Sequence, residues 1–316
     1  MDYYKTSISV KGKLLEVNGI NIEKRDIVSE GMFIKVARLK EEWFQNIDNP
    51  EYTIEELKRR RFPVDVFTFK QELSENIPKY NYYMEYDNSA AITITTYEDW
   101  FNKKVHPMVR RAIRKSEKKG VIVKSIEFND ELVQGITKIY NETQIRQGRK
   151  FWHYGKKFDT VKKENNTFVE NSQFVGAYIN EELVGFMKIV FSTNTAIPMQ
   201  ILSLISHRDK AIPNALISKA VQICSERKVH YFVYGKISRG INGLDTLSEF
   251  KQRNGFEKIE IPRYYVPMSV VGEYILKYKL HHGLKGLIPE EYLNKLKEYR
   301  NKYYDYRYKN YGEIMV

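Results

Sequence analysis

The sequence contains very little cysteine: among its 316 residues, Cys224 is the only one. An intrachain disulfide is therefore excluded, and so is a zinc site built mainly from cysteines. Long apolar runs are missing as well. No stretch approaches the roughly 18–20 apolar residues of a membrane-spanning helix, and the first residues lack the apolar segment of a secretory signal. We therefore expect a soluble or peripheral protein of the reducing cytoplasm, with any peripheral contact at the inner membrane face.

Glycine, proline and histidine are also few, at 17, 9 and 6 residues. With 42% hydrophobic and 29% charged residues, the composition excludes disordered and fibrous proteins and predicts a packed core. The histidines are scattered, and no metal-binding spacing such as HExxH occurs. The sequence therefore predicts no metal site.

Positive charge is what the chain has in excess. Its formal net charge is +12, with an isoelectric point near 9.3. Such a charge favours anionic partners: the phosphates of CoA, nucleic acid, sugar phosphates or an acidic membrane surface. The sign alone does not choose among them.

The first hundred residues predict a few short elements. Residues 6–20 alternate in places and contain the turn-prone pair Asn18-Gly19, which indicates two strands joined at that turn. Residues 53–61 predict a helix, because Thr53 followed by Glu56 forms a capping-box pattern. Residues 64–70 and 90–96, which are rich in β-branched and aromatic side chains, predict strands.

A basic helix is expected next, ending at Gly120. Its exposed side carries the cations Arg110, Arg111, Arg114, Lys115, Lys118 and Lys119. One interpretation is a solvated face, and the other is an electrostatic surface for a polyanionic donor or acceptor. A second helix is expected over residues 130–142, where apolar side chains recur at helical spacing.

From Phe174 onward, strand and helix patterns alternate. The expected order is three strands, a helix, a strand, a helix and a last strand, at residues 174–179, 183–191, 196–205, 214–228, 231–235, 245–255 and 257–268. Residues 180–182 predict a hairpin turn between the first two strands. This alternation predicts an α/β (α+β) fold with a mixed sheet covered by helices.

Two local motifs add a family resemblance. RRAIRKSEKKGV, at residues 110–121, resembles the basic helix of FemAB-related transferases, and LSEFKQRNGFEKIEIPRYYVP, at residues 247–267, is similar to their FK-x-x-x-GF block. Together with the element order, residues 85–268 resemble the GNAT (Gcn5-related N-acetyltransferase) superfamily and its FemAB-related members. The resemblance implies a GNAT-like fold with a smaller N-terminal half, an acyltransferase activity, and a place in glycan or cell-envelope biosynthesis.

In GNAT proteins, a Q/R-x-x-G-x-G/A loop before a helix holds the pyrophosphate of CoA. The matching residues 208–213 begin with Arg208, but Ala211 and Pro213 replace the expected pattern, and proline has no N–H to donate. The expected phosphate ligands are Arg208, Lys210, Asn214 and Lys236. The donor stays open between acyl-CoA, a carrier-protein thioester and aminoacyl-tRNA.

Three side chains are candidate catalytic groups. His207 is a candidate general base or a surface histidine at a strand end, and Tyr234 is a candidate proton donor or a core aromatic. Glu249 is a candidate base, although the alternating charges of Glu249, Lys251 and Arg253 usually mark a solvated face. The resemblance implies that a backbone N–H within residues 199–205 binds the acyl carbonyl oxygen.

The loop at residues 146–156 combines cations, a histidine and aromatic rings. It predicts a binding site for an acceptor such as a sugar, nucleotide or phosphorylated amine, or an aromatic-anchored connector with a solvated basic side. The candidate acceptor ligands are Arg146, Arg149, Trp152, His153 and Tyr154.

We expect three regions: 1–125 ending in the basic helix, a GNAT-like domain at 126–270, and a basic, tyrosine-rich helical tail at 271–316. The tail is expected to pack as helices or to rest on anionic lipid. The predicted function is transfer of an acyl or aminoacyl group to a small-molecule or glycan amine, with tRNA as one carrier of the donor. The alternative is a non-catalytic GNAT-like protein that binds RNA or another polyanion.

Overall fold

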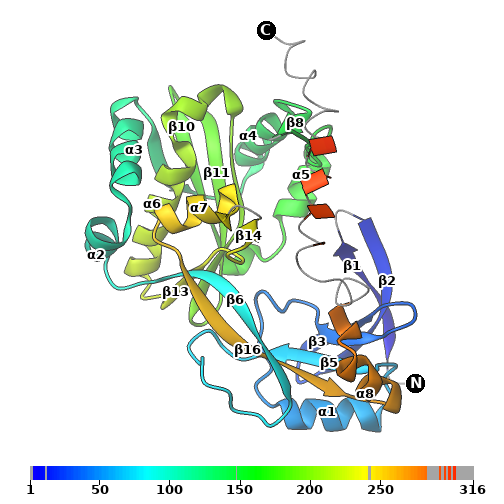
Figure 1. Cartoon of the computed structure of the whole chain (residues 1–316). Coiled ribbons are helices and arrows are strands. Elements are labelled where there is room, and N and C mark those ends of the chain that lie inside the picture. The colour runs from blue at the N-terminus through cyan, green and yellow to red at the C-terminus, as the bar shows by residue number, and fades with distance from the viewer. Residues whose placement is uncertain are drawn as a thin grey trace. The chain divides into compact units, whose positions relative to one another are not determined.

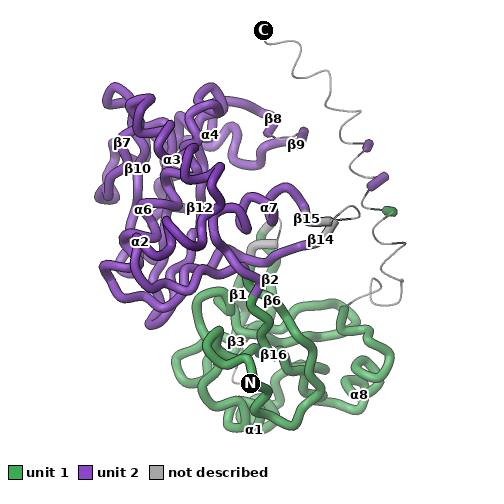
Figure 2. Tube along the Cα trace, turned by 60° about the vertical axis from the view of Figure 1, so that its left-hand side comes forward, with its two compact units in different colours: residues 1–89, 259–297 green, residues 90–258, 298–316 purple. Residues whose placement is uncertain are grey.

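The computed structural model describes residues 3–10, 13–146, 148–240 and 243–282, together with residues 292, 295, 296, 298, 299, 302 and 303. By its internal contacts the chain forms two compact units (Figure 2). Unit 1 comprises Met1–Ser89 and Ile259–Lys297, and unit 2 comprises Ala90–Lys258 and Glu298–Val316. The expected regions ending at residues 125 and 270 stay a prediction. Most of the tail lies outside the described residues.

Unit 1 contains a sheet with the strand order β1-β2-β3-β4-β5-β16. Its elements are β1 (Tyr4–Val10), β2 (Lys13–Ile22), β3 (Arg25–Glu30), β4 (Val36–Leu39), α1 (Pro50–Arg59), β5 (Val66–Lys70), the larger parts of β6 (Tyr83–Thr93) and β16 (Glu257–Pro267), and α8 (Val270–Lys277). β1 with β2, β2 with β3, β3 with β4, and β5 with β16 pair antiparallel, whereas β4 and β5, which α1 connects, pair parallel.

Two helices cover opposite faces of this sheet. Ile54 and Leu57 of α1 share a core with Phe67 and Tyr264, whereas α8 packs against the alternate residues Val66 and Tyr265. Helix α8 (orange in Figure 1) approaches closely enough that a β-carbon on Gly272 would lie 2.0 Å from the carbonyl oxygen of Asp65. Glycine is therefore required at that contact.

Two expectations for unit 1 were wrong. Asn18-Gly19 lies inside β2, paired with β1 and β3, and the turn between β2 and β3 is Glu23-Lys24, with φ of 49° and 63°. The helix at 53–61 begins earlier, because Asn49 is its N-cap and accepts a bond from the Tyr52 N–H. Glu56 does not complete a capping box and instead binds Arg59 of the last turn and the C-cap residue Arg60.

Unit 2 contains a second strand series with the order β6-β13-β12-β11-β10-β7. Its main elements are α2 (Tyr97–Asp99), η1 (Trp100–Lys104), α3 (Pro107–Lys118), β7 (Ile122–Ile126), α4 (Asp130–Asn141), α5 (Phe158–Asn165), η2 (Val169–Asn171), β10 (Ser172–Ile179), β11 (Glu182–Phe191), β12 (Thr195–Ser203), η3 (Ile205–Lys210), α6 (Ile212–Glu226), β13 (Tyr231–Val233) and α7 (Thr246–Arg253). Two short ladders pair β8 (Ile145–Arg146) with β9 (Arg149–Lys150) and β14 (Arg239–Gly240) with β15 (Gly243–Leu244).

Helices cover both faces of the central strand β11 (Figure 1). Residues 183–190 of β11 are all buried, which explains their nearly continuous apolar sequence. Gly185 faces α6, since a β-carbon there would lie 2.5 Å from Ile212, and Phe186 faces α4 and the Tyr140 ring. The expected mixed sheet flanked by helices is confirmed.

Local residue patterns in the sequence of unit 2 predicted most of its elements correctly. Gly120, with a φ of +78°, follows α3 in the left-handed conformation expected after a helix end. Asn180 and Glu181 both have positive φ and form the predicted hairpin turn. In the part of the chain that the structure describes, no helix combines the length and the apolarity that crossing a membrane requires.

Candidate functional site

The sheet of unit 2 opens at one place. Parallel pairing of β12 with β13 is confined to Thr195 with Tyr231 and Ala196 with Phe232. Beyond it, β13 and the following residue stay with β6, where the Tyr234 N–H donates to the Ala90 carbonyl. Residues 197–203 of β12 therefore have no ladder partner on the β13 side, and their edge offers backbone groups to a ligand.

A β-bulge lies on this open stretch. Lys188 of β11 pairs with Gln200 and Ile189 pairs with Pro198, so Met199 is an extra residue on β12. Bulges redirect neighbouring backbone groups and side chains. Met199 is 41% exposed. The region in which a carbonyl-binding N–H was expected therefore contains an irregular, accessible backbone.

The start of α6 follows this strand and differs from a glycine-rich phosphate loop. Ala211 caps the helix with a φ of 51°, and Pro213 has no N–H. The N–H groups of Asn214 and Ala215 donate to the Ala211 carbonyl oxygen. Three of the first four helix positions thus cannot donate to a ligand. The backbone does not fit the pyrophosphate cradle of CoA.

Cationic side chains lie next to the start of α6. Arg208 is exposed and has no ion pair with any residue in the described ranges. The Lys210 Nζ lies 2.7 Å from His207 Nδ1 and 3.8 Å from a carboxylate oxygen of Asp209. The Asn214 side chain is turned to α7, where its Nδ2 donates to Asn254 Oδ1 at 3.1 Å. Arg208 and Lys210 are therefore the predicted donor ligands best placed for an anion.

The contact with Lys210 bears on the role of His207. An ammonium group only donates, so Nδ1 of His207 accepts and the proton of the neutral ring sits on Nε2. In this arrangement the free nitrogen is an N–H donor. The geometry favours His207 as a hydrogen-bond donor over the general-base role considered from the sequence.

Glu142, at the end of α4, connects this loop to the predicted acceptor loop. Its carboxylate accepts from the Ile205 N–H at 2.6 Å, from the N–H and the hydroxyl of Ser206 at 2.9 Å each, and from Arg146 at 3.3 Å. A cavity of about 430 Å³ opens beside it. Its lining residues are Lys138, Asn141, Glu142, Glu182, Leu204, Ser206 and His207.

The acceptor loop divides into buried and exposed side chains. Arg146 is half-buried, donates to the carbonyls of Ser203 and Ile139 at 3.0 Å each, and has its pKa lowered by burial. His153 is 3% exposed. Burial, assisted by the charges of Lys156 and Arg146, lowers its pKa to about 3, so the ring is neutral.

The exposed members of this loop are aromatic and basic. Trp152 is 62% exposed and Tyr154 is 41% exposed, and Arg149 is also exposed. The Lys156 ammonium lies 3.8 Å from the centre of the Trp152 ring and binds Glu164 at 2.7 Å. Trp152 and Tyr154 are the predicted acceptor ligands that can stack against a ligand, whereas Arg146 and His153 support the loop from below.

Sequence reasoning missed a buried polar group beneath this loop. The Gln200 side chain bonds the Tyr140 hydroxyl at 2.7 Å and His153 Nε2 at 3.0 Å. Lys188, 2% exposed, donates to the carbonyl of Asn165 at 2.8 Å and to that of Thr167. Burial lowers the pKa of Lys188 to about 8. Polar residues inside apolar strand runs were the only available signal for this group.

The end of β13 holds a second group. Burial raises the pKa of Tyr234, and the Lys251 Nζ lies 4.6 Å from the centre of its ring. Lys251 is 4% exposed and donates to the Lys236 carbonyl at 2.8 Å, so the interpretation of this position as part of a solvated face was wrong. Glu249 is exposed and pairs with Arg253.

The FK-x-x-x-GF motif is thereby explained by packing. Lys251 anchors the residues after β13, and the Phe256 ring lies 5.6 Å from that of Phe232. Gly255, with a φ of +84°, leaves room for Trp100, whose indole N–H donates to the Asn254 carbonyl at 3.0 Å. The motif fixes α7 against the open end of the sheet.

The basic helix α3 packs beside α6 and η3. Arg110 donates to the carbonyls of Phe101 and Asn102, whereas Arg111, Arg114 and Lys118 are exposed. Lys119, after the last turn, forms an ion pair with Asp209 of η3. The structure therefore places the basic helix α3 beside η3, which carries the predicted donor ligands Arg208 and Lys210.

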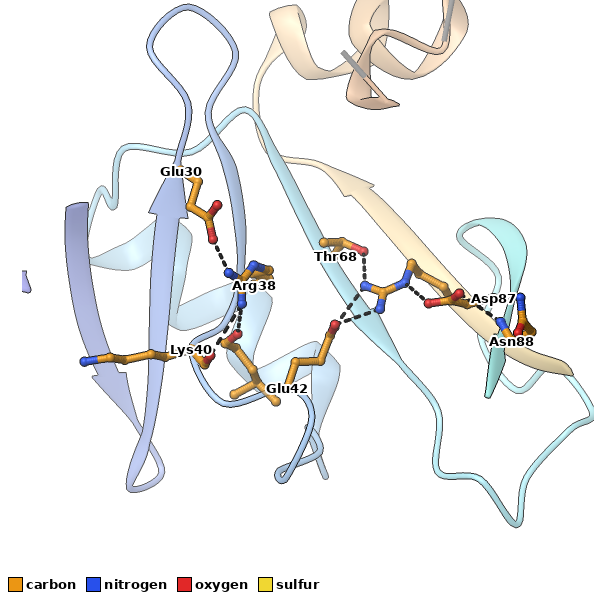
Figure 3. Close-up of polar contacts among 9 residues, drawn as sticks. Glu30, Arg38, Lys40, Glu42, Thr68, Asp87 and Asn88 are labelled. Atoms are coloured by element: carbon orange, nitrogen blue, oxygen red, sulfur yellow. Dashed lines mark hydrogen bonds and ion pairs between the residues drawn. The ribbon is translucent and has the colours of Figure 1, made fainter. Parts of the chain in front are cut away.

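A different polar cluster lies in unit 1 (Figure 3). Arg263 of β16 donates to both carboxylate oxygens of Glu42 at 2.9 and 2.7 Å, to Thr68 at 3.3 Å and to Asp87 at 3.2 Å. Burial lowers the pKa of Arg263, but these partners raise it further and keep it above its ordinary value. Its donors are engaged within the protein, so this cluster is structural.

The chain matches no protein-family model and no curated protein. It does match solved structures. One is the C-terminal domain of a putative lysylphosphatidylglycerol synthetase from Agrobacterium fabrum, with 11% identity, 88% of this chain and 89% of that chain covered, and a TM-score of 0.52. Another is the L-PGS from Bacillus licheniformis, with 14% identity, 87% and 90% covered, and a TM-score of 0.51.

A match to FemX has 9% identity, 82% and 88% coverage and a TM-score of 0.46. At these identities the likeness concerns the fold. The protein thus shares the fold of the two synthetase structures. The order of its elements agrees with the order expected from the sequence.

Proposed function

We propose that the protein transfers an acyl or aminoacyl group to an amine at the place where β12 leaves β13. The observation that carries this proposal is the pairing of β12 with β13, which ends after two residues and is followed by the bulge at Met199. A strand that leaves its neighbour presents backbone N–H groups in a fixed direction. Such donors stabilise the oxyanion that forms when an amine attacks a carbonyl carbon.

The proposed transfer forms one bond, breaks another and moves a proton. The amine nitrogen bonds to the carbonyl carbon, the bond from that carbon to the carrier oxygen or sulfur breaks, the amine loses a proton, and the leaving group gains one. Tyr234 carries its proton at neutral pH, and burial raises its pKa further, so its hydroxyl can donate a hydrogen bond to the leaving group. The Nε2–H of His207 suits a hydrogen bond to an oxygen of donor or acceptor.

The carrier that the basic surface supports best is aminoacyl-tRNA. The start of α6 has too few backbone donors for a CoA pyrophosphate, so side-chain cations must hold the phosphates. Helix α3 has 12 residues and is about 18 Å long, with exposed cations along it. A row of that length suits a polyanion better than one pyrophosphate.

For the acceptor, Trp152 and Tyr154 favour a flat or sugar-like amine, because exposed aromatic rings stack on such groups. A glycan or cell-envelope precursor with a free amine has this chemistry. A contact of the tail with a membrane stays a prediction, since residues 283–291 and 304–316 lie outside the described ranges.

Arg208→Ala tests the position of the donor. A hydrogen bond to a charged group contributes about 1.5–3 kcal/mol, so we expect donor affinity to fall roughly 10- to 100-fold. The matched control is Arg227→Ala at the C-terminal end of α6, the helix whose start follows Arg208, and it should leave affinity unchanged. Equal affinities of parent and Arg208→Ala, measured by fluorescence anisotropy with labelled tRNA and by titration with acyl-CoA, would remove Arg208 from the site.

The second candidate function is RNA binding without chemistry, which the exposed cations of α3 also support. Single-turnover assays with aminoacyl-tRNA, acetyl-CoA and longer acyl-CoAs over a panel of amines separate the two. Transfer from any donor supports the enzyme. Tight binding of uncharged tRNA, with no stabilisation by any thioester and no transfer, supports the binding protein instead.

A further inference from the structure

Unit 1 contains a group of metal-ligand side chains that the acyl-transfer proposal does not use. Glu85 lies on β6, and His281 and His282 follow α8, 196 and 197 positions later in the sequence. One ligand atom from each lies within 4.8 Å of the others. Among the described residues, this is the one group of three or more such side chains that converge in this way.

The distances within the group suit one small ion. His281 Nε2 lies 3.3 Å from Glu85 Oε1, and His282 Nε2 lies 3.1 Å from Oε1 and 2.9 Å from Oε2. Two ligands bound at about 2.0–2.1 Å to a tetrahedral zinc are roughly 3.3 Å apart. Both imidazoles already present Nε2 to the same carboxylate, so an ion between them needs only small side-chain shifts.

Aromatic rings and a hydrogen bond support the ligands from behind. The Tyr83 hydroxyl donates to Glu85 Oε1 at 3.0 Å. The Tyr265 ring lies 4.5 Å from the ring of His281, whose side chain is 0% exposed, while that of His282 is 42% exposed. Such outer contacts orient metal ligands, and the exposed histidine leaves an open side for entry and for a water ligand.

The three side chains offer two imidazole nitrogens and one carboxylate oxygen to an ion.

We propose that Glu85, His281 and His282 form a binding site for a divalent transition metal, with zinc as its ligand, that joins the end of α8 to β6. Two imidazoles and a carboxylate are donors that zinc takes, whereas magnesium and calcium prefer oxygen ligands throughout. The bound ion links two segments far apart in the sequence and so stabilises unit 1. Because 196 positions separate Glu85 from His281, no spacing in the sequence predicted this group.

The test uses the full chain, stripped with EDTA and titrated with zinc by calorimetry and elemental analysis. We expect one equivalent bound, a melting temperature that rises with zinc and not with magnesium, and reversal by EDTA. Binding should weaken as the pH falls from 7 to 5.5, because protons compete for the imidazoles.

Variants assign the site. Glu85→Gln and His282→Asn should each weaken zinc binding by more than the roughly 10–100-fold that loss of an outer contact costs, and Tyr83→Phe by about that smaller amount. His282 is partly exposed, so His282→Asn should fold, which circular dichroism verifies. The control is His230→Asn, an exposed histidine in unit 2, which should bind zinc as the parent does. Equal zinc affinity in parent, Glu85→Gln and His282→Asn, or no stoichiometric binding by the parent, overturns the proposal in favour of a hydrogen-bonded cluster.

Discussion

Lys188 shows how one residue combines burial, charge and a helix end. Its ammonium group lies beneath the sheet face covered by α4 and α5 and donates to carbonyls at the end of α5. A cation at that end is favourable because helix C-termini carry partial negative charge. Desolvation nevertheless disfavours the charged form and lowers the pKa to about 8. The two effects therefore act in opposite directions on the charged form of Lys188.

A pH dependence of stability follows from Lys188. Between about pH 8 and 10.5 the folded protein has released this proton and the unfolded chain still binds it, so the free energy of unfolding should rise with pH in that window. The rise is up to about 3 kcal/mol. Urea unfolding at pH 7.5 and pH 10 should show it in the parent and not in Lys188→Met, with Lys150→Met at an exposed site behaving like the parent. A parent and Lys188→Met with parallel pH profiles would mean that the amine is not desolvated.

Single residues also mark what the sequence could and could not predict. Gly120, Asn180 and Glu181 act through their own backbone conformation, and the sequence identified their turns. Lys188 and Lys251 act through carbonyl groups contributed by other segments. A single sequence does not show which segments meet, so their burial was not predicted.

At the scale of elements, α4 is both a core helix and a support for the site. Its buried residues Leu132, Val133, Ile136, Ile139 and Tyr140 recur at helical spacing, which is why its bounds were predicted well. Its last turn carries Glu142, which holds η3 in place. The link between α4 and η3 depends on tertiary contact and was not predicted.

Removing the charge of Glu142 should loosen η3. Glu142→Gln keeps the shape but loses the charge-assisted bonds to the Ile205 and Ser206 N–H groups, and it introduces an NH₂ group where an acceptor is needed. We expect a loss of about 1–3 kcal/mol of stability and weaker donor binding. Hydrogen exchange of residues 204–210 is the direct measurement. Glu131→Gln, exposed on the first turn of the same helix, is the control, and equal exchange in the two variants would contradict the supporting role.

At the scale of the molecule, the fold followed from patterns that repeat over many residues, whereas the site arises where such patterns are interrupted. Neither composition nor periodicity predicts the bulge at Met199 or the early end of the β12–β13 pairing. The basic surface was predicted in part. The sequence predicted its cations on one helix, and the structure adds that α3 lies beside the start of α6.

The charge of α3 predicts how the protein responds to salt. If phosphates bind along this helix, the logarithm of the tRNA affinity should fall linearly with the logarithm of salt concentration. Reversing Arg111, Arg114 and Lys118 to glutamate should weaken binding and reduce the magnitude of that slope by about one per lost phosphate contact. Reversing Lys24, Lys58 and Lys277 in unit 1 changes the net charge equally, from +12 to +6, and should leave most of the slope intact. Similar slopes for the two triple variants would show that net charge, and not the surface of α3, attracts the polyanion.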